Sequence, residues 1–410
     1  MLVVEDGEKL AKKALAKAEL KAEIGKQVEH HHRELIELSL KIHANPELGF
    51  RETKASTWLA SYLRRNGFRI EKGVGGLPTA FKAVYGSGQP VIALLGEYDA
   101  LPEVGHACGH NIIGVSAVGA GVASKSVVDS CGGTVAVFGT PAEELFGGKD
   151  RMLKAGVFEG VDAAMIVHPG RRNMTITEAL ACISLEVQFF GKAAHAAAYP
   201  EQGINALEAM ILGFNAVNSL RQHIKDKARI HGIITHGGEA ANIVPAYSAA
   251  TLLVRAPDSG YLDELKQKVL NCLTGAAQAT GARLDHKWAE TVYAPMNNNL
   301  FLAELFAQNL ETLGRRVKPF EPRFGFGSTD MGNVSQVIPA IHPTVAIAPS
   351  GVLLHSADFA RAAASEDGHK GLLDAARALA MTVADLLSEP EALARVKQEF
   401  GGSHDKGRHA

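Results

Sequence analysis

Cysteine is scarce in this chain of 410 residues, and the four that occur, at positions 108, 131, 182 and 272, show no regular spacing. Cysteines so placed do not form a disulfide framework, so we expect a reducing compartment, the cytoplasm. The N-terminus turns at once to Glu5-Asp6 and then to a lysine-rich stretch, without the apolar core and cleavage pattern of a secretion signal. No apolar run reaches the roughly 18 residues that a membrane helix needs.

An excess of charge of one sign is also missing. The chain has 42 basic and 44 acidic residues, and its formal net charge is −2. Binding to nucleic acid or to a membrane surface depends on a field of one sign, so we expect neither partner, but a small-molecule substrate. The length exceeds the size at which a single core keeps growing, which predicts two domains.

Strands and helices alternate in the first part of the chain. The pattern is helical from residue 5 to about 65, with a break at 45–50 where Pro46 and Gly49 lie. We then expect strands over 80–85, 91–95, 134–138 and 161–167, and helices over 112–128 and 149–155. This alternation predicts an α/β domain with a mainly parallel sheet flanked by helices.

The pattern changes near residue 183. The following block reads strand, helix, strand, strand, helix, strand over 183–189, 204–221, 230–235, 249–254, 262–279 and 283–291, which predicts an inserted ferredoxin-like α+β module. The first pattern then resumes, with a helix over 300–313, a glycine-rich loop over 325–332, a strand over 344–348 and a helix over 370–387. We therefore predict a catalytic domain from 1–182 and 295–410, interrupted by an insertion over 183–294.

Side chains that bind metals follow several of the predicted strands. A thiol and an imidazole lie two residues apart in Gly105-His106-Ala107-Cys108-Gly109-His110, and further candidate ligands are Glu144, His168 and His355. The carboxyl ends of parallel strands meet at one edge of a sheet, where α/β proteins place their active sites. Cysteine, histidine and carboxylate together are the ligands of zinc and related metals.

These residues predict a centre of two divalent metal ions. Cys108 would bridge or cap the pair. Glu143 is next to the ligand Glu144, and since neighbouring side chains in extended chain point in opposite directions, we expect Glu143 to stay unligated. It would then take a proton from the attacking water. Asp99 is a candidate for orienting a ligand imidazole, and Glu97 a weaker one, although ordinary acids at a strand end give the same pattern. Thiolate favours zinc, whereas carboxylate and water also suit manganese or cobalt.

Each of these residues has an ordinary structural explanation when it is taken alone. Adjacent glutamates are commonly solvated surface acids, and single cysteines and histidines are commonly buried in cores. The metal site is therefore predicted by the whole set.

The insertion has polar residues of its own. His195 follows a predicted strand, Asn242 lies in a glycine-rich turn, and Arg255 ends another strand. Imidazole and amide donors can stabilise a developing oxyanion, and a guanidinium matches a carboxylate through two hydrogen bonds. We predict catalytic or substrate-binding roles for these three residues.

From about residue 27 to 390 the chain closely resembles the dinuclear-metal aminoacylase and carboxypeptidase family. Within it, the Xaa-Arg (β-alanyl-lysine) dipeptidases and the aminobenzoyl-glutamate hydrolases are most similar. The motifs that carry the resemblance are GHACGHN at 105–111, GTPAEE at 139–144, NIVP at 242–245 and GSTDMGNV at 327–334. Asn111 stands where many amidohydrolase relatives have aspartate, and the dipeptidase-like members share this asparagine.

The resemblance implies metal ligands at Cys108, His110, Glu144, His168 and His355, a base at Glu143, and an inserted lid that forms a homodimer. It also implies that His195 and Asn242 reach the site of the partner subunit, and that Arg255 contacts the substrate.

We therefore predict a metal-dependent hydrolase of dipeptides or N-acyl amino acids that cleaves the amide next to a free carboxylate. An aminobenzoyl-glutamate-type or aromatic N-acyl hydrolase is an alternative. A non-catalytic metal-binding scaffold is an alternative of another class.

Overall fold

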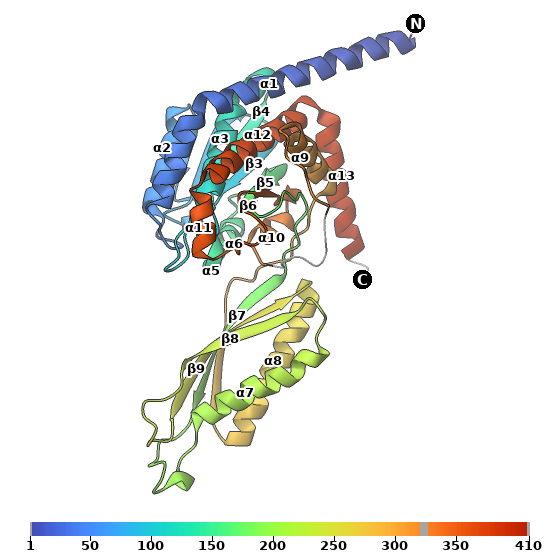
Figure 1. The fold of residues 1–410 in the computed structure, drawn as a ribbon. Coiled ribbons are helices and arrows are strands. Elements are labelled where there is room, and N and C mark those ends of the chain that lie inside the picture. The colour runs from blue at the N-terminus through green and yellow to red at the C-terminus, as the bar shows by residue number, and fades with distance from the viewer. Residues whose placement is uncertain (1, 320–326, 408–410) are drawn as a thin grey trace. The chain divides into compact units, whose positions relative to one another are not determined.

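The computed structural model describes residues 2–319 and 327–407, and within it the chain divides into two compact units (Figure 1). Unit 1 comprises Met1–Thr177, Met296–Phe324 and Asn333–Ala410, and unit 2 comprises Glu178–Pro295 and Gly325–Gly332.

The glycine-rich loop belongs to unit 2, whereas the predicted division assigned it to the catalytic domain. The backbone N–H of Leu180 donates to the carbonyl of Gly327 at 2.8 Å, and this bond ties the loop to the start of the insertion. The first two loop residues, 325 and 326, lie outside the described residues.

Unit 1 is built on a six-stranded sheet in the order β1-β2-β4-β3-β5-β11. Strands β4, β3, β5 and β11 run parallel, while at one side β2 pairs antiparallel with β4 and β1 pairs antiparallel with β2. The strands are β1 (Arg69–Lys72), β2 (Phe81–Ser87), β3 (Val91–Gly96), β4 (Gly133–Gly139), β5 (Ala163–Met165) and β11 (Ala340–Ile341). The mainly parallel sheet is confirmed, and β1, a mostly exposed strand without an apolar pattern, was not predicted.

The centre of unit 1 is a helix made of small residues. Every residue of α3 (His110–Ala123) is buried, and α3 packs against β3 and against α1 (Leu2–His43) and α12 (Glu366–Ser388), which lie beside it in Figure 1. Together with α4 (Lys125–Cys131), it is long and apolar enough to cross a membrane by length and composition alone. However, 89% of that apolar window is buried inside the protein, as in the core helix of a folded domain.

Unit 1 has further α-helices among the described residues. They are α2 (Thr53–Arg65), α5 (Glu143–Phe146), α6 (Gly148–Lys154), α9 (Leu300–Thr312), α11 (Ala357–Ala363) and α13 (Pro390–Gly407). A further short helix, α10 (Met331–Ser335), crosses the boundary between the units.

A small second sheet connects the two parts of unit 1. After β5 the chain leaves the main sheet and forms β6 (His168–Gly170), which pairs in parallel with β12 (Thr344–Ala346). His168 lies opposite Thr344 in this ladder. The pairing brings a residue that precedes the insertion close to the segment that leads to His355.

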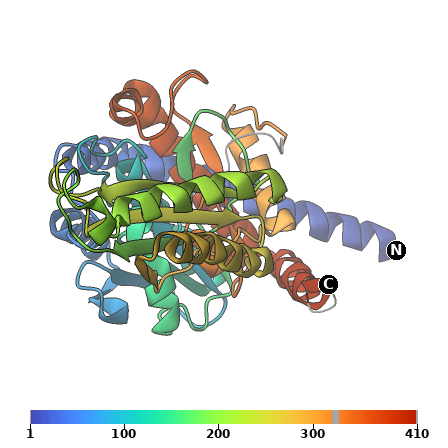
Figure 2. The ribbon, with the colours of Figure 1, turned by 90° about the horizontal axis from the view of Figure 1, so that it is seen from below.

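Unit 2 is a four-stranded antiparallel sheet in the order β10-β7-β9-β8. Its strands are β7 (Ala181–Phe190), β8 (Arg229–His236), β9 (Tyr247–Ala256) and β10 (Arg283–Trp288). Helices α7 (Ala206–Leu220) and α8 (Ser259–Thr280) pack against each other and against the sheet, and they lie side by side in Figure 2. Its elements follow one another as strand, helix, strand, strand, helix and strand. This is the predicted ferredoxin-like arrangement.

Candidate active site

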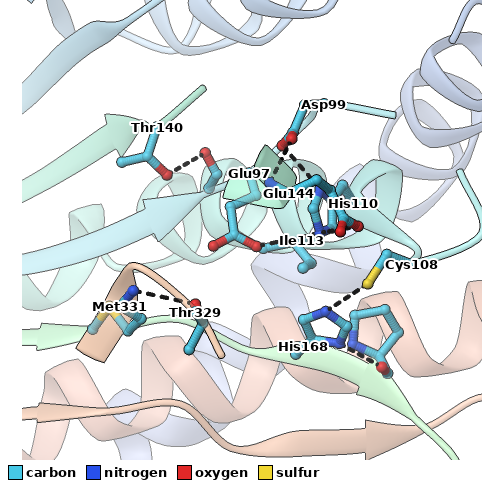
Figure 3. A network of polar contacts seen from close by, with 12 residues as sticks. Glu97, Asp99, Cys108, His110, Ile113, Thr140, Glu144, His168, Thr329 and Met331 are labelled. Atoms are coloured by element: carbon cyan, nitrogen blue, oxygen red, sulfur yellow. Dashed lines mark hydrogen bonds and ion pairs between the residues drawn. The ribbon is translucent and has the colours of Figure 1, made fainter. Parts of the chain in front are cut away.

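Cys108 lies between two histidines that are far from it in the sequence. Its Sγ is 3.3 Å from Nε2 of His168 and 3.4 Å from Nε2 of His355, and the contact with His168 is drawn in Figure 3. His168 uses its other ring nitrogen, Nδ1, to contact the carbonyl of Pro169 at 2.6 Å. Burial, with smaller effects of His342 and His110, lowers the pKa of His168 to about 3, so its ring is neutral, the form that binds metals.

His110 is the first residue of α3, and Asp99 fixes its orientation. Nδ1 of His110 is 3.0 Å from Oδ1 of Asp99, so Nε2 is turned toward the other candidate ligands (Figure 3). Burial alone would raise the pKa of Asp99, but His110 and the N–H of Glu144 outweigh it and hold this pKa below its ordinary value. Nε2 of His110 lies 3.7 Å from Oε1 of Glu144.

Glu143 and Glu144 are the first two residues of the one-turn helix α5. We expected them in extended chain with opposite side-chain directions, and that expectation is wrong because Ala142, with φ 60° and ψ 46°, turns the chain directly from β4 into the helix. Neighbouring helical residues point about 100° apart. One oxygen of each glutamate lies within 4.8 Å of the other and of a nitrogen of His110.

His355 comes from the far end of the chain and is held by its backbone. Its N–H donates to the carbonyl of Ala107 at 2.9 Å, and its φ of 61° is in the left-handed region. Nε2 of His355 lies 3.7 Å from Oε2 of Glu144. The loop that carries Cys108 therefore positions His355 as well.

All five predicted ligands meet in unit 1, in two overlapping groups whose candidate ligand atoms lie within 4.8 Å of one another. Cys108 belongs to both groups, which are Cys108, His110 and His168, and Cys108, Glu144 and His355. Two ligands bound to one metal at about 2.0–2.3 Å in a tetrahedral arrangement are about 3.3–3.8 Å apart, the range of the contacts given above.

Two buried atoms of the cluster lack a hydrogen-bond partner among the described residues, namely Nε2 of His110 and Oε1 of Glu144. Buried polar atoms are nearly always satisfied, and bound cations would satisfy both of these. The donor set therefore fits a metal centre.

Behind the ligands lie residues that the sequence predicts only weakly, such as Glu97, or not at all. Fully buried Lys149 pairs with fully buried Glu97, whose Oε2 lies 3.6 Å from Nε2 of His110. Burial alone would raise the pKa of Glu97, but Lys149 and His110 lower it below its ordinary value. The ring of His342 lies 5.5 Å from that of His168, and burial lowers the pKa of His342 to about 4. Lysine in a helix and histidine before a strand are too common to be singled out.

The three predicted residues of the insertion lie in unit 2, in two places. His195 and Asn242 are neighbours, because His195 bridges to Ile243 and the N–H of Ala196 donates to the carbonyl of Asn242 at 3.0 Å. Arg255 lies near the end of β9 and donates through Nη1 to the hydroxyl of Ser328 at 2.8 Å. His195 and Asn242 are not buried in the single chain.

Thiol, imidazole and carboxylate groups at the sheet edge, with one more buried glutamate beside them, define a metal-dependent hydrolase. Comparisons with known proteins agree with this class. A model of the peptidase dimerisation domain matches residues 181–280. The Xaa-Arg dipeptidase of Mus musculus is 36% identical over 93% of this chain and 92% of its own length. A p-aminobenzoyl-glutamate hydrolase chain of Escherichia coli is 31% identical over 91% of this chain and 93% of its own length.

A solved structure has the same fold. It is a Bacillus subtilis protein described as a dinuclear metal binding peptidase from the M20 family, with a TM-score of 0.68, 21% identity, and coverage of 88% of this chain and 99% of that one. The chain described here belongs to the M20 peptidase family. It is thus an amide-bond hydrolase by family.

Proposed function

We propose that the protein hydrolyses the amide bond of dipeptides or N-acyl amino acids next to a free carboxylate. The convergence of Cys108, His110, Glu144, His168 and His355, with Glu143 buried beside them, is the observation that carries the proposal. The similarity to Xaa-Arg dipeptidases over nearly the whole chain supports a dipeptide substrate.

The five ligands would hold two divalent cations, zinc or manganese, with cobalt as a substitute. Such ions would polarise the scissile carbonyl and lower the pKa of the attacking water. Glu143 would accept the proton of that water and then deliver it to the leaving amine. Asp99 would keep the proton of His110 on Nδ1, so that Nε2 stays available as a donor atom.

Arg255 would bind the free carboxylate of the substrate. A guanidinium offers two parallel N–H donors to a carboxylate, and the hydroxyl of Ser328 already orients one of its nitrogens. Amidated substrates should therefore react poorly. His195 and Asn242 would donate hydrogen bonds to the developing oxyanion.

We further propose a homodimer in which the two groups of unit 2 serve different sites. Phe190 pairs with Tyr247, and Cys182 with Arg255, so β9 separates Arg255 from the loops with His195 and Asn242. From Tyr247 to Arg255 the strand covers about 26 Å at ~3.3 Å per residue. A dipeptide is too short to contact both groups of one copy, which supports a contribution of His195 and Asn242 to the partner's site.

The surface of unit 2 supports this homodimer. Strand β8 is an edge strand of the sheet, and Ile233 on it is 66% exposed. Ile211 and Leu212 on α7 are also exposed. Apolar side chains beside an open strand edge are typical of a surface that another chain covers. The name of the matched model, a dimerisation domain, agrees with this assignment.

An aminobenzoyl-glutamate-type or aromatic N-acyl hydrolase is the second candidate, favoured by the similarity to the Escherichia coli protein. Hydrolysis of a panel of dipeptides, aliphatic and aromatic N-acyl amino acids and aminobenzoyl-glutamate, with zinc and with manganese, would separate the two. Activity on dipeptides that is lost on chelation and restored by metal is expected. Turnover of aromatic acyl substrates alone would favour the second candidate, and no turnover of any substrate would overturn both. The cytoplasmic location stays a prediction from the cysteine content.

A further inference from the structure

Glu52 is a buried glutamate that lies far from the ligand cluster in the sequence. It is 0% exposed and lies directly before α2. Its Oε1 accepts the backbone N–H of Ala142 at 2.8 Å, and its Oε2 accepts the hydroxyl of Thr79 at 3.0 Å. A burial this complete is costly for a carboxyl group unless its oxygens are hydrogen-bonded, as both are here.

The contact with Ala142 falls at the turn that starts α5. Ala142 has left-handed backbone angles although it is not glycine, and it is fully buried. This conformation is disfavoured for residues with a Cβ atom and persists only where the surroundings hold it. Glu143 and Glu144 follow directly, so the directions of both side chains depend on the angles at Ala142.

Thr79 and the residues just before Glu52 also hold the backbone next to Asp99. The carbonyl of Thr79 accepts the hydroxyl of Tyr98 at 2.6 Å, and Tyr98 lies between Glu97 and Asp99. The N–H of Ala100 donates to the carbonyl of Glu47 at 2.8 Å. The loop from Glu47 to Glu52 thus holds the backbone next to Asp99 and the backbone next to Glu143.

We infer that Glu52 is a positioning residue, whose hydrogen bond to Ala142 fixes the left-handed turn and thereby aims Glu143 and Glu144 into the active site. The inference rests on the proposed roles of these two glutamates in amide hydrolysis and metal binding. Ala142 and Thr79, which donate hydrogen bonds to Glu52, are not proposed metal ligands, so Glu52 would act through the turn. The hydrogen-bond acceptor, and not the charge, is what Ala142 requires.

Three variants test this role. Glu52→Ala should lower kcat by about 10- to 100-fold, the usual effect of losing a residue that orients metal ligands, with KM changed by less than about twofold. Glu52→Gln keeps an acceptor oxygen and should retain kcat within about threefold. Adding Ala142→Gly to Glu52→Ala should recover kcat by about fivefold or more, because glycine adopts the left-handed turn without a partner.

A control variant removes a neighbouring side chain but keeps the backbone contact between Glu47 and Ala100 and the contact with Ala142. The carboxylate of Glu47 caps α2 by accepting the N–H groups of Lys54 and Ala55 at 2.9 and 3.0 Å. Glu47→Ala should therefore lower the melting temperature but leave kcat within about twofold. If Glu52→Ala does not fold, Glu52→Met fills a similar volume without an acceptor and replaces it.

Binding of cobalt provides a readout that does not require turnover. Titration of the metal-free protein with Co²⁺, followed by visible absorption, should give a shifted spectrum and weaker binding for Glu52→Ala, and the wild-type spectrum for Glu52→Gln. A wild-type spectrum and kcat in Glu52→Ala would overturn the inference, as would Glu52→Gln being as impaired as Glu52→Ala. An inactive wild type with a normal cobalt spectrum would instead count against the proposed function.

Discussion

Asp99 holds His110 and Glu144 at the same time. Its Oδ1 is 3.0 Å from Nδ1 of His110, and its Oδ2 accepts the N–H of Glu144 at 3.1 Å. Both oxygens face donors, so Asp99→Asn must turn an NH₂ group toward one of two N–H groups. We expect metal affinity to fall by about 10- to 100-fold, measured by competition with a chromogenic chelator.

Asp129→Asn is a matched control for Asp99→Asn, because Asp129 accepts a hydrogen bond from the hydroxyl of Tyr85 at the surface, away from the ligands. Equal metal affinities of the wild type and Asp99→Asn would contradict the orienting role of Asp99.

Glu143→Gln should separate metal binding from catalysis. An amide cannot accept the proton of the attacking water, so kcat should fall by at least about 100-fold. Because Glu143 is not a proposed ligand, two metal ions per chain should remain, measured by mass spectrometry of bound metal. The exposed Glu159→Gln serves as a control. Retained hydrolysis in Glu143→Gln would show that another group is the base.

The two ligand groups predict different losses of metal binding for Cys108→Ser and His355→Ala. Cys108→Ser alters the atom shared by both groups, so binding of both ions should weaken, whereas His355→Ala should mainly affect one. The number of bound ions and their affinities would be measured for each. Cys131→Ser, at an exposed thiol, is the control. An unchanged stoichiometry in Cys108→Ser would argue against a shared thiolate.

Mixing two inactive variants tests the exchange of residues between subunits. In a mixed dimer of His195→Ala and Arg255→Ala, one of the two sites would have both functional residues and the other neither. Random reassortment makes half of the dimers mixed, so about a quarter of the wild-type activity should return. Each variant alone provides the baseline. Absence of any gain on mixing would mean that both residues act within one chain.

A charge on the exposed edge should prevent that dimer from forming. Ile233→Lys places an ammonium group on β8, where Ile233 is 66% exposed in the single chain. We expect a monomer with an intact fold by light scattering and circular dichroism. Val292→Lys, at a partly exposed apolar residue outside β8, provides a comparison. A stable dimer of Ile233→Lys would place the interface elsewhere.

Burial raises the pKa of Glu52 to about 7, from 4.5 ordinarily. The folded protein therefore binds a proton that the unfolded chain releases between these pH values, and the folded state loses stability as pH rises through this window. Glu52→Gln removes this loss. The free energy of unfolding of Glu52→Gln relative to the wild type should therefore rise from pH 4.5 to 7 by up to about 3 kcal/mol. Urea unfolding of metal-free protein at about pH 5 and about pH 8 measures it. A difference that does not depend on pH would contradict the raised pKa.

Much of this architecture follows from local sequence patterns. The alternation of apolar residues in β7 and β9 and the order of strands and helices predict the α+β insertion, since each element buries one face. Strand direction is not encoded in such a pattern. The run at 80–85 reads like its parallel neighbours, although β2 lies antiparallel to β4.

Some residues of the candidate site could likewise be predicted from the sequence, and others could not. Cys108, His110 and Glu144 could be predicted because they lie in compact motifs that follow strands. Glu52 could not, because its partner Ala142 is 90 residues away in the sequence and the contact exists only after folding. Buried carboxylates that hold backbone turns have no composition or spacing of their own.

The interruption of unit 1 by the insertion affects when the site can form during synthesis. Cys108, His110, Glu144 and His168 leave the ribosome well before His355, which follows the whole of β7 to β10. A nascent chain therefore carries an incomplete ligand set until most of it has been translated.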